Sequence, residues 1–280
     1  MFNTIEEAIA DIKAGKMIIV ADDENRENED HLVMAADCCR AAGIHFMETK
    51  AARPVCWPLS CAQAQRLGLE PMVEHNTDAH CTAFTVSRDK LHGTTTGISA
   101  AERATTARAL ADPKSIGGDF RKPGHIFPLT ARPGGVLQRA GHTEAAVDIT
   151  RLAGLNPAGV ICEIMNEDGT MARLPQLLEF AAREGLKIIS VEELIRYRVL
   201  REKFVKKEVT VPMPTQWGDF VCHAYTSPYG DNPGAVHIAL VKGDISGDEP
   251  VLVRVHSECF TGDLLGSLRC DCGPQLHTAM

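Results

Sequence analysis

Six carboxylates crowd around one arginine in the segment 22–31, which reads DDENRENEDH. The apolar run 17–21 precedes it and predicts a buried strand. The acids then lie at the carboxyl end of a strand, where open α/β sheets bind ligands. Mg²⁺ takes oxygen ligands from one or two carboxylates, and the planar fork of Arg26 suits a phosphate. The segment predicts a metal and phosphate site; the alternative is a solvated acidic loop, the usual role of a charge run.

A second candidate site lies at residues 132–144, which read RPGGVLQRAGHTE. Flexible glycines lead to Thr143, which we predict to be the N-cap of a helix with an apolar face. The N-terminus of a helix offers unpaired N–H groups and the positive end of its dipole. With Arg139 beside it, the segment predicts an anion site. His142 is placed to ligate a metal ion next to that anion.

Two further residues could move protons. Glu163 interrupts the apolar run 158–165, which predicts a strand. Burial would favour its protonated form, which suits a general acid or base, but Glu163 could equally face solvent from an edge strand. His125 follows a glycine in a turn where exposure is expected, although a lone histidine is more often a hydrogen-bonded structural residue.

Three of the ten cysteines have the spacing C-x10-C-x-C, at Cys259, Cys270 and Cys272. Three thiolates with an open fourth position are typical of a catalytic zinc site, because structural zinc sites close with four protein ligands. The amino end is acidic and amphipathic, so we expect no secretory signal and a cytoplasmic protein with reduced cysteines.

Periodicity and turn residues predict the order of the elements. We expect helices over 4–14, 41–49, 61–68, 100–110, from 143, 175–184 and 191–200, and strands over 17–21, 32–36, 55–59, 158–165 and 187–189. The loop 93–97, GTTTG, could cradle an anion or be an ordinary connection, which we favour. The charged segment 201–207 predicts a linker between a domain at 1–200 and a β-rich piece at 208–280, with strands over 209–211, 220–225, 235–241 and 251–255.

Composition excludes several classes. The 280 residues are 44% hydrophobic, enough for a sizeable core. The formal net charge of −8 argues against a nucleic-acid partner. No apolar run reaches the roughly 20 residues that cross a bilayer.

Longer motifs carry a resemblance to known families. Residues 4 to about 200 resemble 3,4-dihydroxy-2-butanone 4-phosphate synthase, through DDENRENE, TAFTVS, HGTTTGIS, RPGGVLQRAGHTEAAVD and GVICEIMNEDGTMAR. Residues from about 208 resemble the start of GTP cyclohydrolase II, through RVHSECFTGDLLGSLRCDCG. The resemblance implies an α+β fold, a layered mixed sheet with helices on both faces, followed by a truncated β-rich C-terminal piece.

The same resemblance implies a lyase of riboflavin biosynthesis that converts D-ribulose 5-phosphate to L-3,4-dihydroxy-2-butanone 4-phosphate and formate. It implies Mg²⁺ or Mn²⁺, with no organic cofactor, and a homodimer with sites at the subunit junction. Carried over by position, Glu27 and His142 would hold the metal, and His125 and Glu163 would be catalytic. The sugar phosphate would be bound by Arg26, Glu27, His31, Arg139, Ala140, Gly141, His142, Thr143 and Glu163.

Two residues depart from the family pattern R-E-N-E-G-D-L-V, because Asp30 replaces the glycine and His31 the aspartate. Asp30 would be strained if the glycine had a positive φ, and its carboxylate should point to the opposite face of an extended segment. His31 replaces an acceptor-only anion with an imidazole. We therefore expect reduced activity, and we expect His31→Asp, ideally combined with Asp30→Gly, to raise turnover.

The departures leave a second function open, a non-catalytic or regulatory riboflavin-pathway protein that pairs with an active homologue. Formate release from ribulose 5-phosphate would separate the two. The later arginine-containing segments of GTP cyclohydrolase II are missing from residues 208–280, so we expect no GTP cyclohydrolase II activity, although zinc could still bind.

Overall fold

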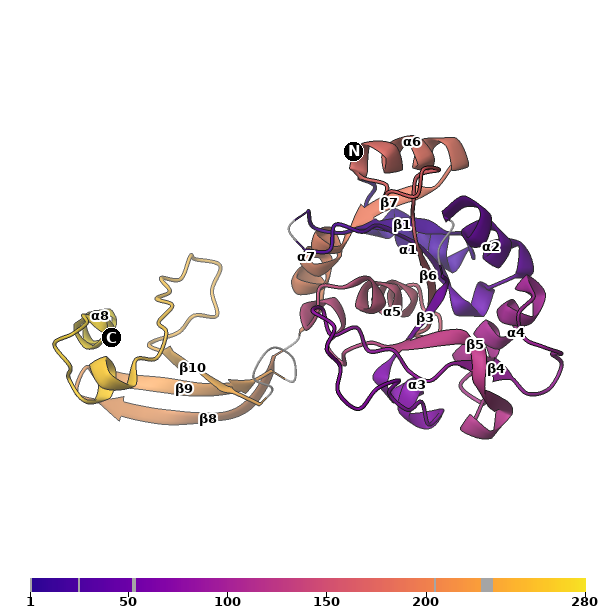
Figure 1. Ribbon diagram of the computed structural model, residues 1–280. Helices are drawn as coiled ribbons and strands as arrows, with labels where there is room; N and C mark the ends of the chain where they lie inside the picture. Colours follow the sequence, from indigo (N-terminus) through magenta and orange to yellow (C-terminus); the bar gives the residue numbers. More distant parts are fainter. Residues whose placement is uncertain (1, 25, 52–53, 204, 228–233) are drawn as a thin grey trace. The chain divides into compact units, whose positions relative to one another are not determined.

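The computed structural model describes residues 2–24, 26–51, 54–203, 205–227 and 234–280. The chain divides into two compact units, the first ending at Glu202 and the second beginning at Lys203. Figure 1 shows both, and each is described by itself.

The first unit contains one seven-stranded mixed sheet in the order β4-β5-β3-β6-β2-β1-β7. Its strands are β1 (Ile18–Ala21), β2 (His31–Ala35), β3 (Cys56–Leu59), β4 (Arg88–Lys90), β5 (Phe120–Thr130), β6 (Gly159–Glu163) and β7 (Lys187–Ser190). Its helices are α1 (Ile5–Lys13), α2 (Ala41–Phe46), α3 (Cys61–Arg66), α4 (Ala100–Ala111), α5 (His142–Leu152), α6 (Leu174–Glu184) and α7 (Val191–Arg201). The β3–β5 and β1–β7 pairs are parallel, and the other pairs are antiparallel.

Helices cover both faces of this sheet (Figure 1), and each face has its own apolar core. Successive side chains of a strand point to opposite faces, so Leu32 of β2 joins the core under α2, α4 and α6. Val33 joins the core under α1, α5 and α7. The predicted α+β fold with a layered mixed sheet is therefore confirmed.

Side-chain caps fix several helix starts where the sequence predicted them. Thr4 accepts a hydrogen bond from the Glu7 N–H and Glu7 returns one, which completes a capping box at α1. Ser99 caps α4 by accepting a hydrogen bond from the Glu102 N–H, but Glu102 accepts from the Ser99 hydroxyl and not from the Ser99 backbone, so the predicted capping box is only half formed. The predicted N-cap at Thr143 is wrong: α5 begins at His142 and Gly141 is its N-cap. A Cβ at Gly141 would lie 2.2 Å from Arg139 Nη1, so a larger residue there would displace the Arg139 guanidinium.

Antiparallel pairing brings distant residues to one edge of the sheet. β1 ends where the acidic segment begins, and His31 at the start of β2 pairs with Val20 on one side and Glu163 on the other. Because β6 lies between β3 and β2, the alternative that Glu163 belongs to an edge strand is wrong. His31 and Glu163 share the sheet face of Val33 and Ile161, which packs against α5.

The second unit is a three-stranded antiparallel sheet of β8 (Lys206–Thr215), β9 (Gly218–Thr226) and β10 (Val236–Val241), followed by α8 (Cys272–Ala279). The strand predicted over residues 251–255 is wrong, because this segment has no regular structure. Among the described residues of this unit, the hydrophobic side chains that are buried are Phe220 and Cys222. In the described ranges, no helix is both long and apolar enough to cross a membrane.

Candidate active site and metal centre

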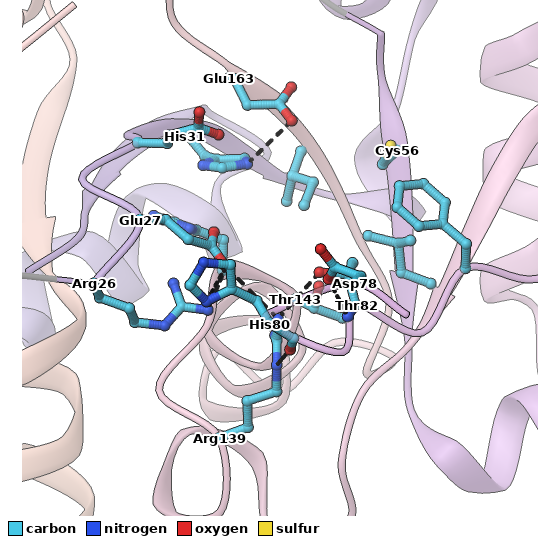
Figure 2. Close-up of a pocket in the computed structure, with 15 residues that line it drawn as sticks. Arg26, Glu27, His31, Cys56, Asp78, His80, Thr82, Arg139, Thr143 and Glu163 are labelled. Carbon is cyan, nitrogen blue, oxygen red and sulfur yellow. Dashed lines mark hydrogen bonds and ion pairs between the residues drawn. The ribbon is translucent and has the colours of Figure 1, made fainter. Parts of the chain in front are cut away.

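A pocket of about 370 Å³ lies in the first unit at the edge of the sheet where β1 and β6 end (Figure 2). It is lined by Arg26, Glu27, Glu29, His31, Cys56, Asp78, His80, Thr82, Phe84, Leu129, Arg139, His142, Thr143, Ile161 and Glu163. Side chains from the two segments that the sequence singled out therefore line one cavity.

The acidic segment folds around Asp22. Its Oδ2 accepts hydrogen bonds from the Glu27 backbone N–H at 3.1 Å and from Arg26 Nη1 at 3.0 Å. Arg26 Nη2 also lies 2.7 Å from Glu27 Oε1. These bonds hold Arg26 and Glu27 in the pocket wall, while Asp23 and Glu24 stay exposed. Among the described residues of the segment, the solvated-loop alternative therefore fits Asp23 and Glu24, and the other residues are at least partly buried.

Asp22, Glu27 and His142 each offer one ligand atom, and the three atoms lie within 4.8 Å of one another. Asp22 Oδ1 and both ring nitrogens of His142 are buried without a hydrogen-bond partner. Burial lowers the pKa of His142 well below its ordinary value, and His31 and Arg26 add to the effect. The Val20 backbone opposes the shift without reaching hydrogen-bond geometry. The imidazole is therefore neutral.

A neutral imidazole and two carboxylates form a donor set that fits a divalent cation such as Mn²⁺ or Mg²⁺. Buried polar atoms without partners are costly in a protein interior, and an ion would satisfy these. The sequence singled out Glu27 and His142, but not Asp22. The spacing of the six carboxylates does not indicate that Asp22 is a ligand, because the chain reverses direction within this segment between β1 and β2.

Arg139 lines the same pocket (Figure 2), and its Nη2 lies 3.9 Å from Glu27 Oε1. Its Nη1 pairs with Glu144 at 2.7 Å, its Nη2 bonds Thr82 Oγ1 at 3.2 Å, and its Nε bonds the His80 carbonyl at 3.1 Å. The first residues of α5 follow directly, so Arg139 and a helix N-terminus face the same space. Thr143 lines the pocket, whereas Ala140 and Gly141 form the turn behind it.

His31 stacks on His142, with ring centroids 3.9 Å apart and planes inclined by 25°. Its Nε2 lies 3.8 Å from Glu163 Oε1. Burial lowers the pKa of His31 to about 4, even though Glu27 opposes the shift, so the ring is neutral at pH 7. The residue that departs from the family pattern therefore lies between the predicted metal ligand and the predicted catalytic glutamate.

The side chain of Asp30, the residue before His31, does not line this pocket. This was expected, because neighbouring residues of an extended segment point to opposite faces. Its Oδ1 accepts a hydrogen bond from the Asp22 N–H at 2.8 Å. Burial raises its pKa to about 6. The expected strain at Asp30 is absent, because the positive φ of this segment, among its described residues, belongs to Asn28 at 51°.

His125 lies outside the pocket of its own chain. It is on β5, its Nδ1 is 2.8 Å from Asp89 Oδ2, and its side chain is 43% exposed. Asp89 is buried and also accepts a hydrogen bond from the His125 backbone N–H at 3.0 Å. The ring is therefore held in one orientation, with one face towards solvent.

The sequence analysis missed one wall of the pocket, formed by Asp78, His80 and Thr82. Asp78 Oδ2 accepts a hydrogen bond from the Thr82 N–H at 2.8 Å, and His80 Nδ1 lies 3.6 Å from Glu27 Oε1. Asp78 and His80 directly precede the TAFTVS motif, and Thr82 is its first residue. Their position at a block that matches the family was the signal that could have identified them.

The threonine-rich loop is an ordinary connection, as favoured. Glu102 of α4 accepts hydrogen bonds from the backbone N–H groups of Thr95 and Gly97, so an anion from the chain itself occupies those donors.

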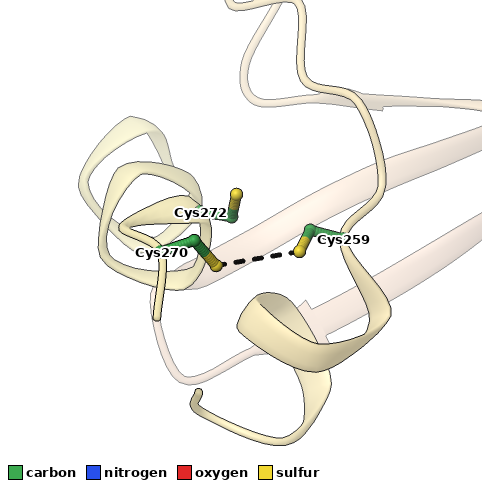
Figure 3. Close-up of side chains that lie close together, drawn as sticks. All are labelled: Cys259, Cys270 and Cys272. Carbon is green, nitrogen blue, oxygen red and sulfur yellow. Dashed lines mark hydrogen bonds between the residues drawn. The ribbon is translucent and has the colours of Figure 1, made fainter. Parts of the chain in front are cut away.

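The second unit contains the other metal-capable cluster, Cys259, Cys270 and Cys272 (Figure 3). Cys259 Sγ and Cys270 Sγ are 3.8 Å apart. Hydrogen bonds, first from the Gly262 backbone and then from Thr261, lower the pKa of Cys259. A Cβ on Gly262 would lie 2.7 Å from Cys270 Sγ, so only glycine lets the loop pass this close to the thiols.

Comparison with known proteins agrees with these two units. The family model of 3,4-dihydroxy-2-butanone 4-phosphate synthase matches residues 6–197, and that of GTP cyclohydrolase II matches residues 206–280. The first match covers more than half of the chain, which therefore belongs to the 3,4-dihydroxy-2-butanone 4-phosphate synthase family.

Named relatives come from riboflavin biosynthesis. The riboflavin biosynthesis protein RibBA of Bacillus cytotoxicus is 58% identical over 280 residues, which are 100% of this chain and 70% of the relative. RibBA of Bacillus mycoides has the same identity and coverage.

Solved structures give the same result. RibBX, a two-domain 3,4-dihydroxy-2-butanone 4-phosphate synthase from A. baumannii, has a TM-score of 0.83 and 45% identity, covering 98% of this chain and 80% of that chain. A 3,4-dihydroxy-2-butanone 4-phosphate synthase in complex with two magnesium ions has a TM-score of 0.69 and 40% identity, covering 71% of this chain and 98% of that chain.

Proposed function

We propose that this chain converts D-ribulose 5-phosphate to L-3,4-dihydroxy-2-butanone 4-phosphate and formate, using Mg²⁺ or Mn²⁺. One observation carries the proposal: Glu27 and His142, which form a three-ligand cluster with Asp22, line the same pocket as Arg139 and Thr143 at the start of α5. A sugar phosphate needs both of these features, a cation for its hydroxyl and carbonyl oxygens and an anion site for its phosphate.

Each wall has its own task in this reaction. Arg139 and the N–H groups at the start of α5 bind the phosphate and so fix the position of the sugar chain. Glu163 removes and returns protons at the sugar carbons, since it is a carboxylate facing the same cavity. A divalent cation held by Asp22, Glu27 and His142 would stabilise negative charge on the substrate oxygens.

Formate release decides this proposal. We expect release from ribulose 5-phosphate that EDTA abolishes and Mg²⁺ restores. Glu27→Gln should lower it by roughly 10²-fold or more, whereas the matched control Glu24→Gln removes the same charge from an exposed position of the same segment and should leave it unchanged. Equal turnover in the two variants would contradict the assignment of Glu27.

We also propose a homodimer in which His125 acts in the pocket of the second subunit. In support, the ring is exposed yet oriented by Asp89, and it lies outside its own pocket. Phe127, two residues along β5, is a large apolar side chain left 37% exposed, and Phe84 at the pocket rim is 39% exposed. Exposed aromatic side chains of this kind suit a protein interface.

Subunit mixing tests the shared site. Glu27→Gln and His125→Ala are each expected to be inactive. A mixed dimer would keep one intact site, formed by Glu27 of one chain and His125 of the other, so mixing the two should restore turnover. Absence of recovery after verified subunit exchange would show that His125 acts in its own chain or not at all.

The replacement by His31 favours a second candidate, a catalytically impaired riboflavin-pathway protein that pairs with an active homologue. His31 occupies the position between His142 and Glu163 where the family pattern has an acidic residue. Absence of formate release by pure, folded, Mg²⁺-loaded protein would support this candidate over the lyase.

For the second unit we propose zinc binding by the three cysteines, without GTP cyclohydrolase II activity. The cysteine triad supports zinc. The small buried core around Phe220 and Cys222 supports the absence of GTP turnover, since a rigid catalytic site needs a packed frame. Formate release from GTP would contradict it.

A further inference from the structure

The loop 132–139, which presents Arg139, is held by two buried acids of α5. Glu144 Oε1 accepts a hydrogen bond from the Arg132 N–H at 3.0 Å, and its Oε2 pairs with Arg139. Asp148, one turn further along the helix, accepts a hydrogen bond from the Val136 N–H at 2.8 Å. Glu144 and Asp148 are 1% and 3% exposed, so these bonds are shielded from water.

A residue far along the sequence completes this support. Arg198 of α7 is 4% exposed, and its Nη1 donates to the Gly134 carbonyl at 2.8 Å and to Asp148 Oδ2 at 2.7 Å. The other side of its guanidinium pairs with Glu202, with Nε–Oε1 at 3.0 Å and Nη2–Oε2 at 2.7 Å. Because the planar guanidinium of Arg198 is hydrogen-bonded on two sides, both its orientation and its distance from the loop are fixed.

The loop fits tightly against this pair. Gly135 has a φ of +60°, and a Cβ there would lie 2.3 Å from Asp148 Oδ2 and 2.6 Å from Arg198 Nη1. The Gly135 carbonyl in turn accepts the hydrogen bond of the Arg139 N–H at 3.0 Å. Direct contacts therefore run from Arg198 through residues 134–136 to the backbone of Arg139.

We propose that Arg198 and Asp148 are positioning residues for the phosphate end of the site. They fix the backbone of residues 134–136, and so place Arg139 and the turn into α5 where a phosphate group is bound. Neither residue lines the pocket, so their effect passes through the loop. The inference rests on the proposed function, because it names what sets the phosphate affinity of the same pocket.

A matched pair of arginines makes the test specific. Arg151 also approaches Asp148, at 3.6 Å, and Glu202, at 2.8 Å, but it is 45% exposed and no bond joins it to the loop. Arg198→Met and Arg151→Met thus remove one positive charge each from the same ion-pair network. We expect Arg198→Met to raise the KM for ribulose 5-phosphate and the Kd for inorganic phosphate by about tenfold, with a smaller change in kcat.

Arg151→Met should leave KM and the phosphate Kd unchanged. In Arg198→Met the Kd for Mg²⁺ should change much less than the Kd for phosphate, because Arg26 and the Glu27 N–H hold Asp22 and Glu27 more closely than Arg139 does, which lies 3.9 Å from Glu27. Amide exchange at residues 134–139 should accelerate. If Arg198→Met does not fold, Asp148→Asn serves as the second variant. It keeps an oxygen for the Val136 N–H and weakens the bond to Arg198, so the same changes should be smaller.

Wild-type phosphate affinity and amide exchange in folded Arg198→Met would overturn the inference, and so would equal loss of phosphate and Mg²⁺ affinity. Absence of turnover in the wild-type chain would count against the proposed function instead. Phosphate binding and amide exchange would still decide the role of Arg198.

Discussion

The two metal-capable clusters found among the described residues differ in what holds them together. Asp22, Glu27 and His142 lie between a seven-stranded sheet and α5, and backbone and ion-pair bonds fix their carboxylates. The three cysteines lie in a unit whose three strands are mostly exposed. The first cluster is arranged by the folded core, whereas the second has little besides its own loop.

We infer from this difference that a bound metal ion would have a different effect in each unit. In the first unit the fold arranges the ligands before an ion arrives, so the ion adds chemistry. In the second unit the ion itself would contribute much of the folding free energy, as in small zinc domains.

The largest effect is expected at the first cluster. His142→Ala removes the imidazole ligand, so we expect Mg²⁺ affinity to fall by about 10–100-fold and formate release by roughly 10²-fold or more. Isothermal titration and the formate assay measure the two. Cys259→Ser is the control, because it alters the other cluster and should leave both values unchanged; a turnover loss in Cys259→Ser would show that the clusters are not independent.

Zinc should act on the second unit alone. At a free Zn²⁺ concentration of about 100 times its Kd, linkage adds about 2.7 kcal/mol to a unit that binds only when folded. Amide exchange over residues 256–280 should slow accordingly, while exchange in β1 and β2 should not change. Equal protection in chelator-treated protein would mean that the cysteine cluster is held by the chain itself.

The sequence predicted some helix starts and site residues correctly and missed others. Local rules located the helix starts at Thr4 and Ser99, because a side-chain N-cap needs only residues three positions apart. Motif resemblance reached Glu27 and His142, which the structure brings together. The sequence could not identify Asp22 as a third ligand or place His125 outside its own pocket, because both depend on how distant segments pair in space.

The side-chain rule for N-caps failed at α5, where contacts between distant residues accompany a different helix start. Thr143 has the better side chain for an N-cap, but α5 starts one residue earlier, at His142, whose ring stacks on His31 of β2. The N-cap is Gly141, which lies against the Arg139 guanidinium. The side-chain rule for N-caps therefore did not identify the start of this helix.

A moderate effect is expected at the residue that departs from the family. His31→Asp restores an anion beside His142 and Glu163, so we expect turnover and Mg²⁺ affinity to rise by about tenfold. Asp30→Gly should not add to it. The Asp30 side chain bonds the Asp22 N–H, and its loss should cost about 1 kcal/mol in the free energy of unfolding. Unchanged turnover in His31→Asp would show that His31 does not limit the reaction.

The smallest effect is a pH dependence within the first unit. The pKa of His31 is about 4 when folded and 6.5 ordinarily, so its contribution to stability is present above pH 6.5 and lost as pH falls towards 4. The pKa of Asp30 is about 6 when folded and 3.8 ordinarily, so its contribution is present below pH 4 and lost as pH rises towards 6. Between about pH 4 and pH 6, these two contributions to the free energy of unfolding therefore change with pH in opposite directions.

Asp30→Asn removes one of the opposing slopes. Between pH 6.5 and pH 4, its free energy of unfolding should therefore fall by about 2 kcal/mol more than that of the wild type, measured by urea unfolding of the first unit. The exposed residue Glu24 supplies the control Glu24→Gln, which should follow the wild type. Since groups shared by all three proteins cancel in the difference, parallel curves for Asp30→Asn and wild type would mean that Asp30 titrates alike in the folded and unfolded chain.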